Sequence, residues 1–394
     1  MRHLTLEEWE KKWIARPIER FDQKNEMFKR PLWDPEVKEL KRKVFGVAMP
    51  KDKAGYHLEE MVLGNASWYL ELGFAEGVII GQTGLFAWDS KQLGVSKPPD
   101  GLKVDFADPA EATRDIKKVA TYFGADMVGV CELDQRWIYS HLFHMYTRES
   151  KPLEIPEEYK YAIAMAHEMD YDLEKYAPAQ IANAATGMGY TKMAFTAGLL
   201  AQFIRGLGYK AIPCGNDTAL SVPVAMQAGL GELARNGLLI TPEYGPRVRI
   251  SKVFTDLPLV PDKPLEFGVT EFCLKCSKCT DACPGQAIIY GDRITEPHNI
   301  SNATGELKWP IDAEKCLAFW GANEATCTVC IRVCPFNKHM NWFHRTSRWF
   351  VDHARWGDPF YRKMDDLLGY GKQKKADNFW AEWQPRQALR ITQK

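Results

Sequence analysis

Eight of the ten cysteines in this chain lie between residues 273 and 334. The first four have the spacing C-x2-C-x2-C-x3-C-P. The other four are an isolated cysteine followed, eleven residues later, by C-x2-C-x3-C-P. Such spacing is typical of ferredoxins that bind two [4Fe–4S] clusters. The two remaining cysteines, Cys131 and Cys214, are expected to be buried free thiols.

In two-cluster ferredoxins the last cysteine of a run binds the other cluster. The pattern therefore predicts a first cluster held by Cys273, Cys276, Cys279 and Cys334. It predicts a second cluster held by Cys283, Cys316, Cys327 and Cys330. Disulfides are an alternative, but they suit a small secreted domain. Zinc is another, but it is usually held by two C-x2-C pairs, and a proline after each run is not part of that pattern.

The 394-residue chain is much longer than a ferredoxin module, which needs about 60–80 residues. Lys plus Arg and Asp plus Glu both number 51, so a broad nucleic-acid surface is not expected. No apolar run reaches the ~20 residues of a membrane span. The N-terminus shows neither an apolar signal core nor a twin-arginine signal. We therefore expect a cytoplasmic protein, or an exported one if a twin-arginine signal precedes this sequence.

Helical and strand patterns alternate before the cysteine runs, which predicts an α+β layered domain. Apolar runs predict strands at 127–131, 161–167, 211–213, 238–240 and 247–251. Apolar spacing predicts helices at 110–123, 191–203 and 222–236. A capping box at Thr5 predicts an N-terminal helix.

Four units are predicted: a mixed N-terminal unit, an α+β core, a ferredoxin-like module and an aromatic-rich tail packed on the core. Their bounds are 1–105, 106–264, 265–340 and 341–394. The core must hold an electron acceptor, because clusters pass single electrons. No Gly-x-Gly-x-x-Gly follows a predicted strand, so a Rossmann cofactor site is unsupported.

Four segments of the core have a combination of motifs that resembles the corrinoid-dependent reductive dehalogenases. They are Gly189-Tyr190-Thr-Lys-Met193, Phe203-Ile-Arg-Gly-Leu-Gly-Tyr-Lys-Ala-Ile-Pro213, Ala228-Gly-Leu-Gly-Glu-Leu-Ala-Arg-Asn-Gly237 and Ile240-Thr-Pro-Glu-Tyr-Gly-Pro-Arg-Val-Arg249. The cysteine motifs, ending in Pro335-Phe336-Asn337-Lys338, match the same family. The resemblance covers about residues 105–340.

This resemblance implies a nitroreductase-like core that binds a base-off cobalamin, with no side chain on the lower face of the cobalt. One [4Fe–4S] cluster would reduce the cobalt and the other would receive electrons from outside. The substrate would be a small organohalide that loses its halogen as halide. The electron donor would be a ferredoxin, a flavodoxin or a membrane partner.

Reductive dehalogenation needs a proton donor and a cation that stabilises the donor's conjugate base. A phenol fits, because it is protonated at neutral pH and can donate when a positive charge stabilises the phenolate. The resemblance places these roles on Tyr190 and Arg249, with Asn216 as a polar partner. The plain alternative is a helix-capping tyrosine, a surface arginine and a turn asparagine.

Two further sets of residues are weaker candidates. Glycines in predicted turns could let the backbone approach the corrin; these are Gly187, Gly189, Gly229 and Gly231. Trp88 and Trp320 could form an apolar wall for the substrate. Glycines are more often helix stops and aromatics are more often core.

Two other functions compete with dehalogenation. An epoxyqueuosine reductase also uses cobalamin and two clusters, but it acts on tRNA and would need a basic surface. A non-catalytic iron–sulfur electron carrier would bind iron without cobalt.

Overall fold

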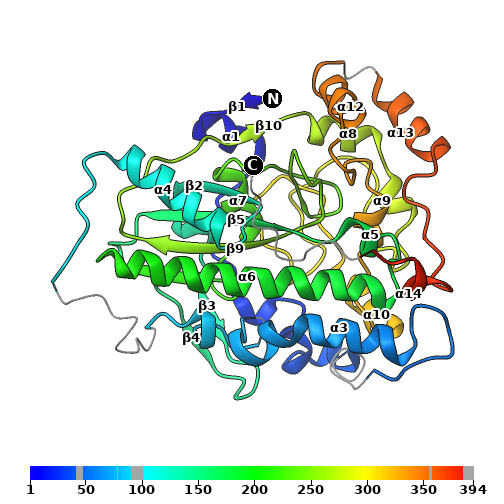
Figure 1. Ribbon diagram of the computed structural model, residues 1–394, viewed down its shortest axis with the longest axis horizontal. Coiled ribbons are helices and arrows are strands. Elements are labelled where there is room, and N and C mark those ends of the chain that lie inside the picture. The colour runs from blue at the N-terminus through cyan, green and yellow to red at the C-terminus, as the bar shows by residue number, and fades with distance from the viewer. Residues whose placement is uncertain (41–47, 78, 90–100, 355–356, 385–394) are drawn as a thin grey trace.

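The computed structural model describes residues 1–40, 48–77, 79–89, 101–354 and 357–384 (Figure 1). A four-stranded antiparallel sheet lies at its centre. Its strands are, in spatial order, β2 (Met127–Glu132), β5 (Tyr161–Glu168), β9 (Val248–Thr255) and β6 (Ala211–Cys214). The apolar runs predicted as strands form all four. Strand β6 lies at an edge of the sheet, as predicted from Pro213. Proline has no N–H group to donate to a neighbouring strand, so it is confined to edge strands.

Two helices cover one face of this sheet, α4 (Pro109–Tyr122) and α6 (Gln180–Gly206). Ile116 and Leu200 from these helices pack against Ile163 of β5, and all three side chains are fully buried. Burying such a side chain contributes about 1.5–3 kcal/mol to the free energy of unfolding. A third helix, α3 (Leu58–Leu70), lies along α6 on the side away from the sheet (Figure 1).

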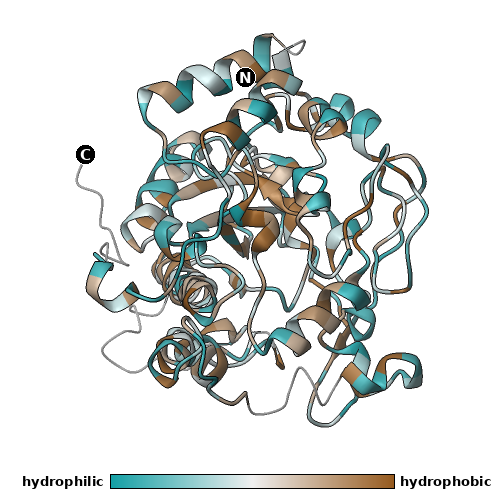
Figure 2. Ribbon diagram, turned by 90° about the vertical axis from the view of Figure 1, so that its right-hand side faces the viewer, coloured by the Kyte–Doolittle hydropathy of each residue, from teal (hydrophilic) through white to brown (hydrophobic). Residues whose placement is uncertain are grey.

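The opposite face is covered by α7 (Ser221–Gln227) and by the N-terminal helix α1 (Leu6–Trp13). The predicted capping box is present, because Thr5 caps α1 together with Glu8. Trp9 of α1 meets Trp137 edge-to-face, with ring centres 6.3 Å apart. Hydrophobic residues concentrate on the central strands between these layers (Figure 2).

Two predicted helices have different bounds in the structure. The helix predicted at 222–236 is wrong beyond Gln227. Gly229 adopts φ +74°, and a Cβ on Gly231 would lie 2.0 Å from the Ile240 carbonyl oxygen, so the chain turns into a strand instead. The helix predicted from residue 191 starts at Gln180 in the structure. The prediction missed its first half because that half is rich in alanine and glycine and lacks a large apolar stripe.

Short strand pairs lie outside the central sheet. These pairs are β1 (Arg2–His3) with β10 (Leu265–Glu266), β3 (His141–Phe143) with β4 (Ser150–Pro152), and β7 (Glu232–Leu233) with β8 (Leu239–Ile240). Four short helices carry the cysteine runs: α8 (Val269–Lys275), α9 (Lys278–Asp281), α10 (Ala313–Asn323) and α11 (Val329–Arg332).

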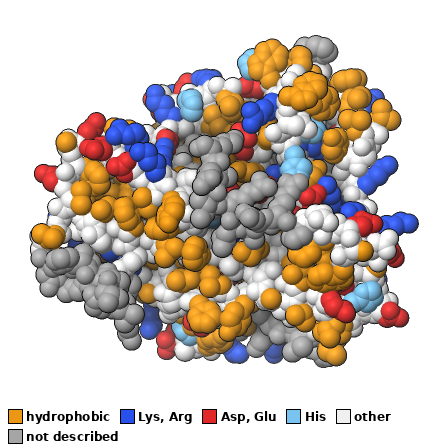
Figure 3. Space-filling model, viewed as in Figure 1, with side chains coloured by type: hydrophobic (Ala, Val, Ile, Leu, Met, Phe, Trp, Pro, Cys, Tyr) orange, Lys and Arg blue, Asp and Glu red, His pale blue; other side chains and the backbone are white. Residues whose placement is uncertain are grey.

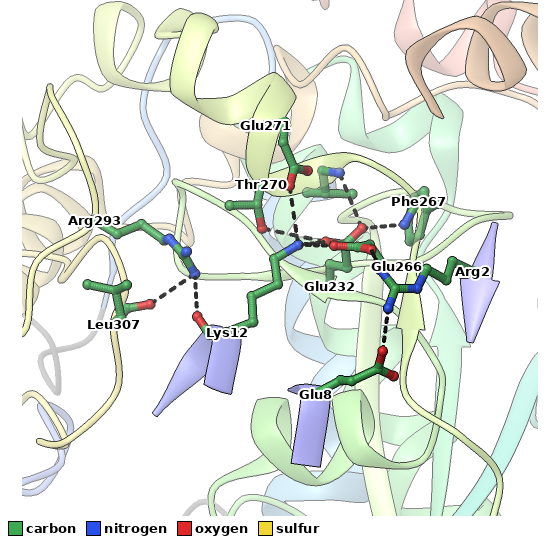
Figure 4. A network of polar contacts seen from close by, with 11 residues as sticks. Arg2, Glu8, Lys12, Glu232, Glu266, Phe267, Thr270, Glu271, Arg293 and Leu307 are labelled. Atoms are coloured by element: carbon green, nitrogen blue, oxygen red, sulfur yellow. Dashed lines mark hydrogen bonds and ion pairs between the residues drawn. The ribbon is translucent and has the colours of Figure 1, made fainter. Parts of the chain in front are cut away.

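A polar network attaches α1 to the segment that leads into the cysteine runs (Figure 4). Lys12 of α1 lies 2.5 Å from Glu266 and 3.5 Å from Glu232. Glu232 also accepts a hydrogen bond of 2.7 Å from the Phe267 amide. Burial raises the pKa of Glu232, and the Lys12 ammonium opposes that rise. The network therefore places a counter-ion beside a buried carboxyl.

The C-terminal segment forms α12 (Trp342–His353), α13 (Asp358–Leu367) and α14 (Phe379–Glu382). Phe379 is buried against Tyr176, with ring centres 5.3 Å apart. Trp342 and Trp349 are 79% and 55% exposed, and apolar side chains gather over α12 and α13 in Figure 3. The predicted tail also includes residues 385–394, which lie outside the described residues. Within the described ranges, no helix combines the length and apolarity needed to cross a membrane.

Candidate active site

Tyr190, Asn216 and Arg249 meet at one point although they come from three elements. Tyr190 lies in the middle of α6, Asn216 follows β6, and Arg249 is on the face of β9 that points toward α6. The Asn216 amide nitrogen donates a hydrogen bond of 3.0 Å to the Tyr190 hydroxyl. The Arg249 guanidinium carbon lies 5.2 Å from the centre of the Tyr190 ring. All three residues are half-buried.

The environment of Tyr190 contains opposing influences on its acidity. Burial raises the pKa of the phenol, and the carboxyl groups of Glu71 and Glu26 raise it further. The Arg249 guanidinium and the hydrogen bond from Asn216 lower this pKa. The phenol is therefore protonated at neutral pH, and its conjugate base has a cation and a donor beside it.

Two predicted glycines are needed for this arrangement, although not in a turn. Gly187 and Gly189 lie inside α6, so the predicted turn at residues 186–189 is wrong. A Cβ on Gly189 would lie 2.8 Å from Cγ of Arg249. A Cβ on Gly187 would lie 2.5 Å from the ring of Trp68. These glycines let Arg249 and Trp68 approach the helix.

Trp68 is a part of this site that the sequence did not indicate. Its ring stacks on Tyr190, with centres 4.6 Å apart and planes 27° apart. Its indole N–H donates to Asn183, at 3.1 Å. Residues 68 and 190 are far apart in the sequence and share no motif, so only the packing of α3 along α6 reveals the contact.

The eight clustered thiols lie close enough to influence one another's acidity, and their division between two clusters stays a prediction. Burial raises the pKa of the Cys273 thiol, and three neighbouring thiols raise it further, those of Cys276, Cys279 and Cys334. Burial likewise raises the pKa of Cys330, with further contributions from Cys327, Cys316, Cys279 and Cys283. All ten cysteines are among the described residues, and none forms a disulfide.

The described residues hold no single-ion metal site at the cysteine runs. Among the described residues, no group of three or more His, Cys, Asp or Glu side chains converges closely enough to hold one metal ion. A cubane cluster separates its four thiolate ligands, because each binds a different iron. Cys131 and Cys214 lie elsewhere in the core, and burial raises the pKa of both.

Arg235 holds the backbone of the first cysteine run. The sequence did not indicate this role of Arg235. Its guanidinium donates to the carbonyl oxygens of Cys273 and Cys276, at 2.7 and 3.2 Å. The same guanidinium lies 4.8 Å from the ring centre of Trp309. Arg235 is almost fully buried, so this loop is held by a fixed cation.

The remaining predicted residues have other contacts. Trp88 packs against the hydrophobic core, and its carbonyl oxygen accepts a hydrogen bond from Arg205. Trp320 packs on Phe28, with ring centres 5.6 Å apart. No hydrogen bond or ring contact links either tryptophan to Tyr190 in the part of the chain that the structure describes. Gly229 and Gly231 closely approach backbone carbonyl groups of the protein itself.

A cavity of about 400 Å³ lies at a different place, between α12, α13 and the segment after Cys334. Aromatic side chains such as Phe336 and Phe350 line it, and Tyr190 and Arg249 do not. We locate the candidate site at Tyr190 rather than in this cavity, because a phenol, an amide and a guanidinium converge at Tyr190.

Comparisons with known proteins identify the family of the chain and the nature of its cysteine-rich segment. Residues 272–337 match the family described as a 4Fe-4S double cluster binding domain. The chain is 36% identical over 378 residues to the tetrachloroethene reductive dehalogenase of Sulfurospirillum multivorans, covering 88% of this chain and 75% of that protein. It is 38% identical over 332 residues to the tetrachloroethene reductive dehalogenase of Desulfitobacterium hafniense, covering 75% of this chain and 60% of that protein.

The fold is also similar to that of a solved reductive dehalogenase, with a TM-score of 0.73. The description of that structure says that it suggests a mechanism for B12-dependent dehalogenation. It is 25% identical, and the match covers 94% of this chain and 49% of that one. The chain therefore spans about half the length of this solved relative.

An α+β core joined to a double [4Fe–4S] cluster domain defines this protein as an iron–sulfur oxidoreductase. The identity over three quarters of the Sulfurospirillum enzyme is more specific than that class. The chain belongs to the reductive dehalogenase family.

Proposed function

We propose that this protein is a corrinoid-dependent reductive dehalogenase that acts on a small organohalide. The reaction takes up two electrons and one proton, breaks the carbon–halogen bond, forms a carbon–hydrogen bond and releases halide. The observation that carries this proposal is the convergence of Tyr190, Asn216 and Arg249, in a chain that also holds a double-cluster domain.

The residues around Tyr190 fit a corrinoid, a group rich in amide side chains. Thr186 lies four residues before Tyr190, so both side chains are on the same face of α6. Its hydroxyl is buried without a hydrogen-bond partner, and the Arg249 Nε is in the same state. A buried polar atom without a partner is costly, and a polar ligand would satisfy it. We infer a nitroreductase-like core that holds the corrinoid base-off.

The corrinoid, when bound, supplies the low-potential electrons. The other parts of the chemistry belong to this chain's own side chains. Tyr190 donates the proton from its hydroxyl, and Arg249 stabilises the phenolate that remains. Asn216 keeps the phenol oxygen in place and donates to it. Trp68 covers one face of the phenol ring and limits water access there.

The clusters would deliver the electrons one at a time. We assign one cluster to Cys273, Cys276, Cys279 and Cys334, and the other to Cys283, Cys316, Cys327 and Cys330. The external donor would be a ferredoxin, a flavodoxin or a membrane partner.

Metal content and halide release test this function together. Protein purified without oxygen after cobalamin is supplied should contain about eight Fe and about one Co per chain. It should release halide from at least one organohalide in the presence of a low-potential reductant. The Tyr190→Phe variant should keep both metals and lose most turnover.

Three outcomes would contradict parts of the proposal. Iron without cobalt would favour a plain electron carrier. Reduction of epoxyqueuosine in tRNA without halide release would favour the epoxyqueuosine reductase. Near-wild-type turnover by Tyr190→Phe would remove the proton-donor role.

A further inference from the structure

A continuous chain of hydrogen bonds leads from the Tyr190 hydroxyl to a buried lysine. The Asn216 amide oxygen accepts a hydrogen bond of 3.1 Å from the Ser221 hydroxyl. Ser221 in turn accepts one of 2.7 Å from the ammonium of Lys252. With the 3.0 Å bond from Asn216 to Tyr190, four side chains form one line.

Lys252 has an unusual position for a lysine. It lies in β9, three residues after Arg249, and strand alternation puts the two side chains on opposite faces of the sheet. Its side chain is fully buried. Arg249 therefore contacts Tyr190 directly, whereas Lys252, on the other face of the sheet, is linked to Tyr190 through Ser221 and Asn216.

Lys252 also holds the loop that carries Asn216. Its ammonium donates to the carbonyl oxygens of Gly215 and Ala219, which flank Asn216 in the loop. Burial lowers the pKa of Lys252 to about 8, and the neighbouring Cys214 and Asp217 oppose that shift. The ammonium is therefore mostly protonated at neutral pH, and it carries only donors.

An ammonium at the end of the line fixes the direction of every bond in it. Because Lys252 can only donate, Ser221 must accept from it. The Ser221 hydrogen then points to the Asn216 oxygen, which turns the amide nitrogen toward Tyr190. The Tyr190 oxygen accepts that bond, so its own hydrogen is free to leave in another direction.

We propose that Lys252 is a positioning residue that acts through Ser221 and Asn216 to direct the Tyr190 proton toward the substrate. The proposal rests on the proposed function, in which Tyr190 is the proton donor. It adds two residues, Lys252 and Ser221, which are linked to Tyr190 through Asn216. Each donor in the line also points its positive end toward the phenolate that proton transfer leaves behind.

The test compares two variants of the holoenzyme, Ser221→Ala and Ser221→Thr. The alanine variant removes the link without leaving Lys252 unpaired, since its two carbonyl partners remain. It should lower kcat about tenfold, the worth of one hydrogen bond, with KM unchanged. The threonine variant keeps the hydroxyl and should restore kcat. Lys252→Met should lower kcat in the same way, and the Ser221 pair decides the test if that variant does not fold.

Two readouts separate positioning from a merely structural role. In the Tyr190→Phe background, Ser221→Ala should cause no further loss of kcat, because the hydroxyl that accepts the last hydrogen bond of the series is then missing. The pKa of Tyr190, followed by NMR with [4-13C]tyrosine and assigned by its absence in Tyr190→Phe, should rise in Ser221→Ala. The alkaline limb of the kcat profile should move to higher pH with it.

An unchanged Tyr190 titration in Ser221→Ala would overturn the proposal. An equal loss of kcat with and without the Tyr190 hydroxyl would do the same. The titration needs no organohalide. If the wild-type protein released no halide, the proposed function would fail while the titration still decided whether Lys252 controls Tyr190.

Discussion

Replacing Arg249 with glutamine should remove most of the electrostatic stabilisation of the Tyr190 phenolate. The guanidinium carbon lies 5.2 Å from the centre of the phenol ring. At an effective dielectric constant of about 20, two unit charges at that distance attract by about 3 kcal/mol. Because the charge on Tyr190 develops only as the proton leaves, this energy belongs to the transition state. We expect kcat to fall by about two orders of magnitude.

The assay is steady-state halide release by anaerobic holoenzyme, with iron and cobalt measured on the same samples. Arg249→Lys is the matched control, because it keeps the charge and should retain a substantial part of kcat. KM should change little in Arg249→Gln, since the substrate before proton transfer carries no corresponding charge. A loss confined to KM, or a kcat within a factor of about two of wild type at full metal content, would refute the electrostatic argument.

Three further predictions concern stability and metal content. Burial raises the pKa of Glu174 to about 7, so the folded state holds its proton more tightly. The free energy of unfolding should therefore fall by about 3 kcal/mol as pH rises from about 4.5 to 7, and Glu174→Gln should flatten that slope in urea titrations. Cys330→Ser should lower the iron content from about eight to about four per chain, whereas Cys131→Ala should leave it unchanged. Gly187→Ala should lower the free energy of unfolding by about 1–3 kcal/mol, because its Cβ would lie 2.5 Å from the Trp68 ring. The midpoint of urea unfolding should fall accordingly, and an unchanged midpoint would show that the ring moves freely.

The sequence predicted best what depends on local spacing. The spacing of the cysteines predicted a double-cluster domain, which the family match over residues 272–337 confirms, whereas the assignment of each thiol to a cluster stays a prediction. The strands of the central sheet are continuous apolar runs and were also predicted. The first half of α6 was missed, because its small residues pack closely without forming an apolar stripe.

The site itself depends on contacts between distant segments. Tyr190, Asn216 and Arg249 were found through the family resemblance, not through any local pattern. Lys252 was missed because a lysine inside an apolar strand gives no sign of which groups surround it. The helix predicted through residue 236 was too long because apolar periodicity outweighed Gly229 and Gly231, where contact with another segment ends it.

Helix α6 fixes the distance between the second cysteine run and the proposed proton donor Tyr190. Its 27 residues span about 40 Å. At its first turn, Gln180 donates to the Glu324 carbonyl oxygen, and Asn183 accepts from Thr326, so this end is attached to the second cysteine run. Tyr190 follows about 15 Å further along the same rigid rod. One residue inserted between these points would rotate Tyr190 by about 100° and away from Asn216. A chimera that exchanges cluster modules between relatives should therefore keep residues 180–190 intact.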